Sequence, residues 1–126
     1  MVMKRFASGL VALVAILHLG FLILEMFLWT SPFGLRTFQI SAEVAASSAV
    51  LAANQGLYNG FLAAGLVWGL VARNGGFSIQ VFFLCCVVVA GLFGAYTATP
   101  SIFFIQALPA AIALAALAIT ARRRTF

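Results

Sequence analysis

Two long stretches of this chain carry no charged side chain. Residues 44–72 and residues 74–121 contain neither an acidic nor a basic residue. A helix rises about 1.5 Å per residue, so about 20 apolar residues cross the hydrocarbon core of a bilayer, which is about 30 Å thick. The whole chain is 65% hydrophobic and 7% charged, far outside the usage of soluble globular proteins. The sequence therefore predicts an integral membrane protein.

The first apolar stretch covers residues 6–28 and follows Lys4 and Arg5, an arrangement that resembles a secretory signal. The apolar run continues to Leu28 without a small-x-small cleavage site, and Trp29 fits an anchor at the membrane interface. We therefore interpret this stretch as a retained transmembrane helix.

The charge-free stretches divide into three further spans. Residues 44–72 suit one tilted helix, which the sequence Arg73-Asn74-Gly75-Gly76 ends. The 48 uncharged residues from 74 to 121 are too many for one crossing, and Thr99-Pro100-Ser101 marks a hinge because proline ends a helix. The predicted fold class is all-α: a single domain of residues 1–126 that forms an integral membrane four-helix bundle, with helices over residues 6–28, 44–72, 77–98 and 102–121.

The basic residues predict the orientation of this bundle. Four spans leave only Arg36 on one side of the membrane and place six basic residues on the other, namely Lys4, Arg5, Arg73, Arg122, Arg123 and Arg124. Because Lys and Arg gather on the cytoplasmic side, we expect both termini in the cytoplasm of a multi-pass inner (plasma) membrane protein, surrounded by the lipid bilayer. The seven basic residues lie scattered at segment ends and form no contiguous patch, which excludes a nucleic-acid partner.

Residues 30–41 interrupt the apolar pattern between the first two spans. Ser31-Pro32 is a turn signal, and the apolar residues that follow predict a loop along the membrane interface. Ser41 is suited to cap the next helix, and Glu43 lies in its first turn, where the helix dipole favours a carboxylate.

Polar side chains gather in the outer half of the predicted bundle. His18 and Glu25 are seven residues apart, so they share one face of the first helix, with Glu25 about 10 Å closer to the outer surface. Such groups are costly in hydrocarbon unless neighbours satisfy them, so they mark either contacts between helices or a binding site. The predicted binding pocket takes residues from all four spans: His18, Glu25, Asn54, Gln55, Tyr58, Asn59, Tyr96 and Gln106.

The second span separates polar and small residues onto adjoining arcs. At about 100° per residue, the polar residues from Asn54 to Asn59 cover one arc, and the small residues Gly56, Gly60 and Ala64 cover the next. We expect the polar arc to face Glu25 and the small arc to let a neighbouring helix pack closely. The alternative is that the amides only hold the helices together through hydrogen bonds.

The sequence carries no motif for catalysis, for a metal or for a cofactor. One histidine and one glutamate are fewer than the three or four ligands of typical metal sites. Nucleophile motifs, phosphate-binding loops and paired carboxylates are missing as well. Gln106 lies close to Pro109, at an expected helix kink. We assign no catalytic residue, no metal and no cofactor.

Three runs of residues together resemble the small bacterial and fungal membrane proteins grouped as domain of unknown function 1304. The runs extend from His18 to Thr30, from Leu51 to Gly69 and from Gln106 to Ala110. The resemblance covers nearly the whole chain and implies a four-helix inner-membrane protein, but it implies no activity. A more distant resemblance is to the membrane-associated eicosanoid and glutathione enzymes, although the second span lacks the internal charge that would bind a glutathione carboxylate.

These observations favour a membrane protein whose outer-half pocket binds or transports a small solute or a proton. A second class stays open, a non-catalytic scaffold or assembly subunit that uses Gly56 and Gly60 to hold a bundle or a homo-oligomer. A third class is a glutathione- or lipid-handling membrane enzyme like those of the distant family.

Overall fold

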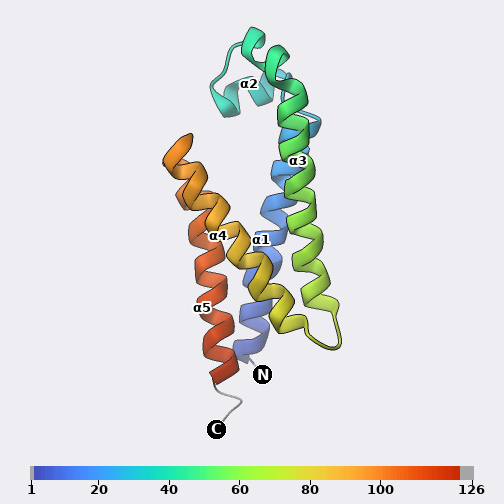
Figure 1. The fold of residues 1–126 in the computed structure, drawn as a ribbon, viewed down its shortest axis with the longest axis vertical. Coiled ribbons are helices and arrows are strands. Elements are labelled where there is room, and N and C mark those ends of the chain that lie inside the picture. The colour runs from blue at the N-terminus through green and yellow to red at the C-terminus, as the bar shows by residue number, and fades with distance from the viewer. Residues whose placement is uncertain (1, 123–126) are drawn as a thin grey trace.

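The computed structural model describes residues 2–122, and the regular elements in that range are all helices (Figure 1). In chain order they are α1 (Val2–Met26), α2 (Pro32–Phe38), α3 (Ala42–Val71), α4 (Gly76–Thr97), η1 (Phe103–Ala107) and α5 (Leu108–Arg122). Helices α1 and α3 lie side by side, and α4 lies beside η1 and α5. The start of α1, the end of α5 and the α3–α4 connection lie at one end of the molecule, here called the terminal end, and α2 lies at the opposite end, here called the α2 end.

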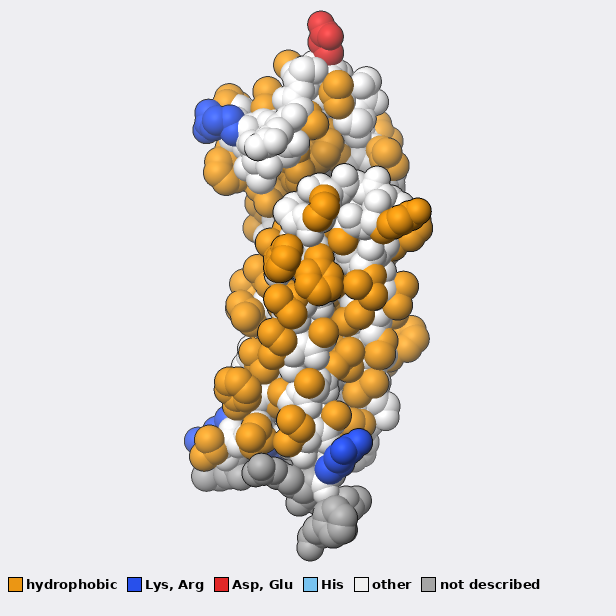
Figure 2. Space-filling model, turned by 90° about the vertical axis from the view of Figure 1, so that its left-hand side faces the viewer, with side chains coloured by type: hydrophobic (Ala, Val, Ile, Leu, Met, Phe, Trp, Pro, Cys, Tyr) orange, Lys and Arg blue, Asp and Glu red, His pale blue; other side chains and the backbone are white. Residues whose placement is uncertain are grey.

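Within the described residues, three segments are long and apolar enough to cross a membrane, namely α1, α4 and Phe103–Arg122. Helix α3 has 30 residues but is not among them, because Asn54, Gln55 and Asn59 lower its hydropathy. On the face shown in Figure 2, hydrophobic side chains cover the surface between the two ends, and the charged side chains lie near the ends. Exposed phenylalanines in α4, such as Phe82, are consistent with a lipid environment.

The helix ends lie within four residues of the ends of the predicted spans. The structure differs from the prediction in residues 30–41, where the expected interfacial loop contains the short helix α2. Ser31 caps this helix by accepting a hydrogen bond from the Gly34 backbone N–H at 3.1 Å, and Pro32 occupies its first turn. The predicted cap of the next helix is confirmed, since Ser41 Oγ accepts from the Val44 backbone N–H at 3.2 Å.

The four long helical segments share a core in the half of the molecule nearer the terminal end. Small and branched side chains dominate this core: Ala7, Val11, Val14, Ala15, Leu66, Leu84, Val87, Ala110 and Ala113. Small residues let helix backbones approach closely, which favours dispersion contacts between helices. Toward the α2 end, α1 and α3 stay together while α4 diverges from them (Figure 1).

A widened turn precedes α5. In η1 the Leu108 backbone N–H donates to Phe103 O, five residues back, as in a π-helix. Pro109 follows directly, and it has no N–H with which to continue an α-helical pattern. Gly91 of α4 packs against this turn, because a Cβ built on Gly91 would lie 2.6 Å from Ala107 N and 2.9 Å from Ala107 Cα.

We predict that Gly91→Ala lowers the free energy of unfolding by about 1–3 kcal/mol, because its Cβ would overlap the backbone of Ala107. The matched control is Gly20→Ala in α1, whose added Cβ would meet no atom within 4 Å. Thermal unfolding of both variants in the same detergent makes the comparison. Equal melting temperatures for the two variants would contradict the close α4–η1 contact.

Candidate functional site

One hydrogen bond between side chains joins α1 to α3 toward the α2 end. Asn59 Nδ2 donates to Glu25 Oε2 at 2.7 Å, and both side chains are half-buried. A hydrogen bond to an ionised carboxylate is stronger than one between neutral groups. The structure therefore brings two of the predicted pocket residues into direct contact.

The glycines of α3 lie in the same contact with α1. A Cβ on Gly56 would lie 3.1 Å from Leu22 O, and one on Gly60 would lie 2.7 Å from Leu22 Cδ1. Ala64, the third residue of the predicted packing arc, is exposed. Asn59 and the two glycines therefore face the same neighbour, whereas the sequence interpretation directed the polar and small arcs toward different ones.

Asn54 and Tyr58 lie on the α4 side of α3. They precede Gly65 by eleven and seven residues, which places all three within about 40° around the helix. Gly65 packs against Phe83 of α4, but α4 has diverged at the level of Asn54 and Tyr58. Both side chains are exposed, and Asn54 Nδ2 donates only within its own helix, to Val50 O at 3.1 Å.

His18 lies in the core rather than beside Glu25. Its Nδ1 is 2.8 Å from Val14 O, and because a carbonyl oxygen only accepts, this nitrogen carries the proton. The other nitrogen, Nε2, is buried and has no hydrogen-bond partner among the described residues. Within residues 2–122, no group of three His, Cys, Asp or Glu side chains is placed to hold a metal ion.

The remaining predicted pocket residues are spread over the molecule. Tyr96 is 90% exposed near the end of α4, and Gln55 is exposed on α3. Gln106 is half-buried in η1, about one turn before the fully buried Ala110. Of the eight predicted residues, only Glu25 and Asn59 have side chains joined by a hydrogen bond to each other.

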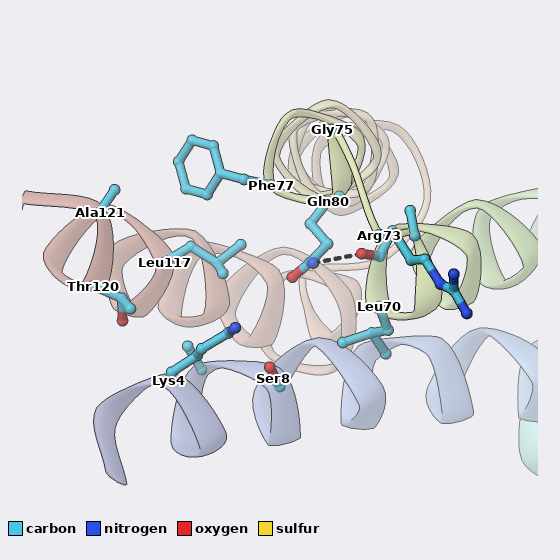
Figure 3. Close-up of a pocket in the computed structure, with 14 residues that line it drawn as sticks. Lys4, Ser8, Leu70, Arg73, Gly75, Phe77, Gln80, Leu117, Thr120 and Ala121 are labelled. Atoms are coloured by element: carbon cyan, nitrogen blue, oxygen red, sulfur yellow. Dashed lines mark hydrogen bonds between the residues drawn. The ribbon is translucent and has the colours of Figure 1, made fainter. Parts of the chain in front are cut away.

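A cavity that the sequence interpretation missed lies at the terminal end, between α1, α3, α4 and α5. Its volume is about 400 Å³, and its polar wall includes Lys4, Ser8, Gln80 and Thr120 (Figure 3). Gln80 is buried, and its Nε2 donates to Gly69 O at 2.7 Å. A single amide inside an otherwise apolar span was the sequence signal for this site.

Comparison with known protein families identifies the chain. The family described as "Protein of unknown function (DUF1304)" matches residues 12–118, and the chain belongs to this family. The resemblance predicted from the sequence is thereby confirmed. No curated protein and no solved structure matches the chain.

We predict that Asn59→Leu lowers the free energy of unfolding by about 1 kcal/mol, the usual range for a polar contact between membrane helices. The reason is that Glu25 would lose its hydrogen-bond partner. The control is Asn54→Leu on the same helix, which removes an exposed amide bonded only to Val50 O and should cost nothing measurable. Denaturant titration in mixed micelles measures both. Equal destabilisation by the two variants would refute the assigned role of Asn59.

Proposed function

We propose that the protein crosses the inner membrane four times, with α1, α3, α4 and Phe103–Arg122 as spans and both termini in the cytoplasm. The charges support this orientation, because Arg36 lies in α2 while the other described basic residues, Lys4, Arg5, Arg73 and Arg122, lie toward the terminal end. Lys and Arg are retained preferentially on the cytoplasmic side. Arg123 and Arg124, which the orientation prediction also used, lie outside the described residues.

The length of α3 and its contact with α1 support the proposal that α3 crosses the membrane. Its 30 residues extend about 45 Å, more than the hydrocarbon core requires. It lies along α1, which is apolar enough to cross. Asn59 donates to Glu25, so one of the three amides in the middle of α3 has a side-chain partner on another helix.

Glu25 lies near the outer boundary of the hydrocarbon in this topology. Twenty residues separate it from Arg5, which corresponds to about 30 Å of helix. A carboxylate at this depth is reachable by solutes from outside while its partner Asn59 holds it in place. This hydrogen bond of 2.7 Å is the observation on which the proposed function rests.

The proposed function is binding or movement of a small polar solute, or of a proton, at this outer site. In three segments, the helix face that packs in the core carries polar residues toward the α2 end. In α1 the face with Val11 and Val14 also carries His18 and Glu25. In α3 the face with Gly65 also carries Asn54 and Tyr58. In η1 and α5 the face with Ala110 also carries Gln106. The carboxylate of Glu25, held by the amide of Asn59, favours a solute that carries hydrogen-bond donors.

The second candidate function is assembly, and the exposed polar arc of α3 favours it. Tyr58 is 56% exposed, and Asn54 and Gln55 are exposed beside it. Polar side chains on a membrane helix can bond a neighbouring helix from another copy. Gly56 and Gly60 already pack against α1 of the same chain, so a homo-oligomer would form through the polar arc rather than through the glycines.

We predict that α3 crosses the membrane, so that positions 37 and 74 lie on opposite sides. Single-cysteine variants Thr37→Cys and Asn74→Cys, made in a background without Cys85 and Cys86, test this with a membrane-impermeant maleimide on intact cells. We expect labelling at position 37 only, and labelling at position 74 after lysis. Labelling of both positions in intact cells would show that α3 does not cross.

We predict that a small solute with hydrogen-bond donors raises the melting temperature of the wild-type protein in detergent, because binding to the folded state stabilises it. The probes are methylammonium, ethanolamine, glycerol and glycine. Glu25→Gln, which keeps a group that can accept from Asn59, should abolish the shift, and Tyr96→Phe should retain it. If no probe shifts the wild type while Gln55→Leu dissociates an oligomer, the assembly function is correct instead.

A further inference from the structure

The cavity at the terminal end contains a buried hydrogen-bond acceptor without a partner. Gln80 is 9% exposed, and its Nε2 donates a hydrogen bond to Gly69 O, which fixes the orientation of the amide. Its Oε1 is buried and has no hydrogen-bond partner in the described residues. Buried polar atoms are nearly always paired, so an orphan of this kind beside a cavity indicates a missing donor.

The same cavity offers positive charge. In Figure 3 the Lys4 ammonium and the Gln80 amide point toward the same space, whereas the Arg73 guanidinium at the rim points away from it. The N-cap residue Gly75 and the first two residues of α4, Gly76 and Phe77, also line the cavity, and Gly75 provides no side-chain cap. The unpaired N–H groups of a helix start carry partial positive charge and favour an anion.

The wall suits a ligand that combines an anion with a hydrogen-bond donor. A bare anion would satisfy Lys4 and the start of α4 but would leave Gln80 Oε1 without a donor. A phosphate group next to an ammonium or a hydroxyl satisfies all three. Leu70, Phe77 and Leu117 add apolar surface to the wall, and about 400 Å³ is enough for a headgroup-sized molecule.

We propose that this cavity binds a phosphate ester that carries a neighbouring ammonium or hydroxyl donor. Lys4 and the N-terminal turn of α4 hold the phosphate, and Gln80 Oε1 accepts from the donor. In the proposed topology the cavity opens at the cytoplasmic interface, where such groups occur both in phospholipid headgroups and in soluble metabolites. The site is separate from Glu25 and Asn59, so it does not depend on the outer site.

The test uses the full chain in a maltoside detergent and follows thermal unfolding with short-chain phosphatidylethanolamine, short-chain phosphatidylcholine and free phosphoethanolamine. Phosphatidylcholine is the matched probe because it keeps the phosphate and lacks the donor. We expect phosphatidylethanolamine to bind about tenfold more tightly than phosphatidylcholine, since it alone can donate to a buried acceptor. Equal stabilisation by the two lipids would overturn the proposal.

Three variants and the soluble probe complete the test. Lys4→Ala should weaken phosphatidylethanolamine binding about tenfold by removing a charge-assisted hydrogen bond, whereas Arg5→Ala, which removes the same charge outside the cavity wall, should retain it. Gln80→Leu should remove the preference for phosphatidylethanolamine over phosphatidylcholine.

Free phosphoethanolamine binding as tightly as the lipid would support the site and identify a soluble source. Equal losses in Lys4→Ala and Arg5→Ala would refute it. Because Glu25→Gln leaves this cavity intact, failure of one site does not imply failure of the other.

Discussion

The close contact between α1 and α3 depends most on Gly56 of α3. A Cβ at Gly56 would lie 3.1 Å from the backbone atoms Leu22 O and Met26 N, whereas one at Gly60 would meet only the side chain of Leu22. Asn59 lies between these glycines in the chain, and its amide reaches Glu25 because the backbones are near each other. If the two helices moved apart, the Glu25 carboxylate would lose its hydrogen bond from Asn59. In a membrane, water would not replace that bond as readily as in solution.

The polar chemistry of the molecule lies toward its two ends, with an apolar core between them. Toward the α2 end the dominant group is a carboxylate held by an amide, which suits a solute that donates hydrogen bonds. At the terminal end it is an ammonium beside an unpaired amide oxygen, which suits an anion that also carries a donor. His18 is the exception, since it is buried in the core with one nitrogen unpaired. The two proposed sites therefore differ in charge and in location.

Sequence reasoning identified individual helices better than it identified their neighbours. The positions of the long helices and the cap at Ser41 follow from charge-free runs and local turn chemistry, which depend on neighbouring residues alone. Glu25 and Asn59 were both named as site residues, and the prediction that the polar arc faces Glu25 holds for Asn59. It fails for Asn54 and Tyr58, which lie on the α4 side of α3, because angles around one helix do not show which neighbour each residue meets. Helix α2 was missed because Ser31-Pro32 serves equally as a turn signal and as a helix start. Gln80 was missed because one amide in an apolar span does not reveal what surrounds it.

The sequence by itself determined the membrane-compatible helices, their connections and the side chains that share a stripe on each helix. These properties follow from hydropathy and from the fixed 3.6-residue period of the helix. Only the tertiary structure decided that α4 diverges from α3 between Gly65 and the α2 end, which leaves Asn54 and Tyr58 exposed. It also decided that Gln80 and Lys4 line one cavity. Those outcomes depend on how helices tilt and rotate against each other. Packing between residues far apart in the chain sets these angles, and no local pattern records them.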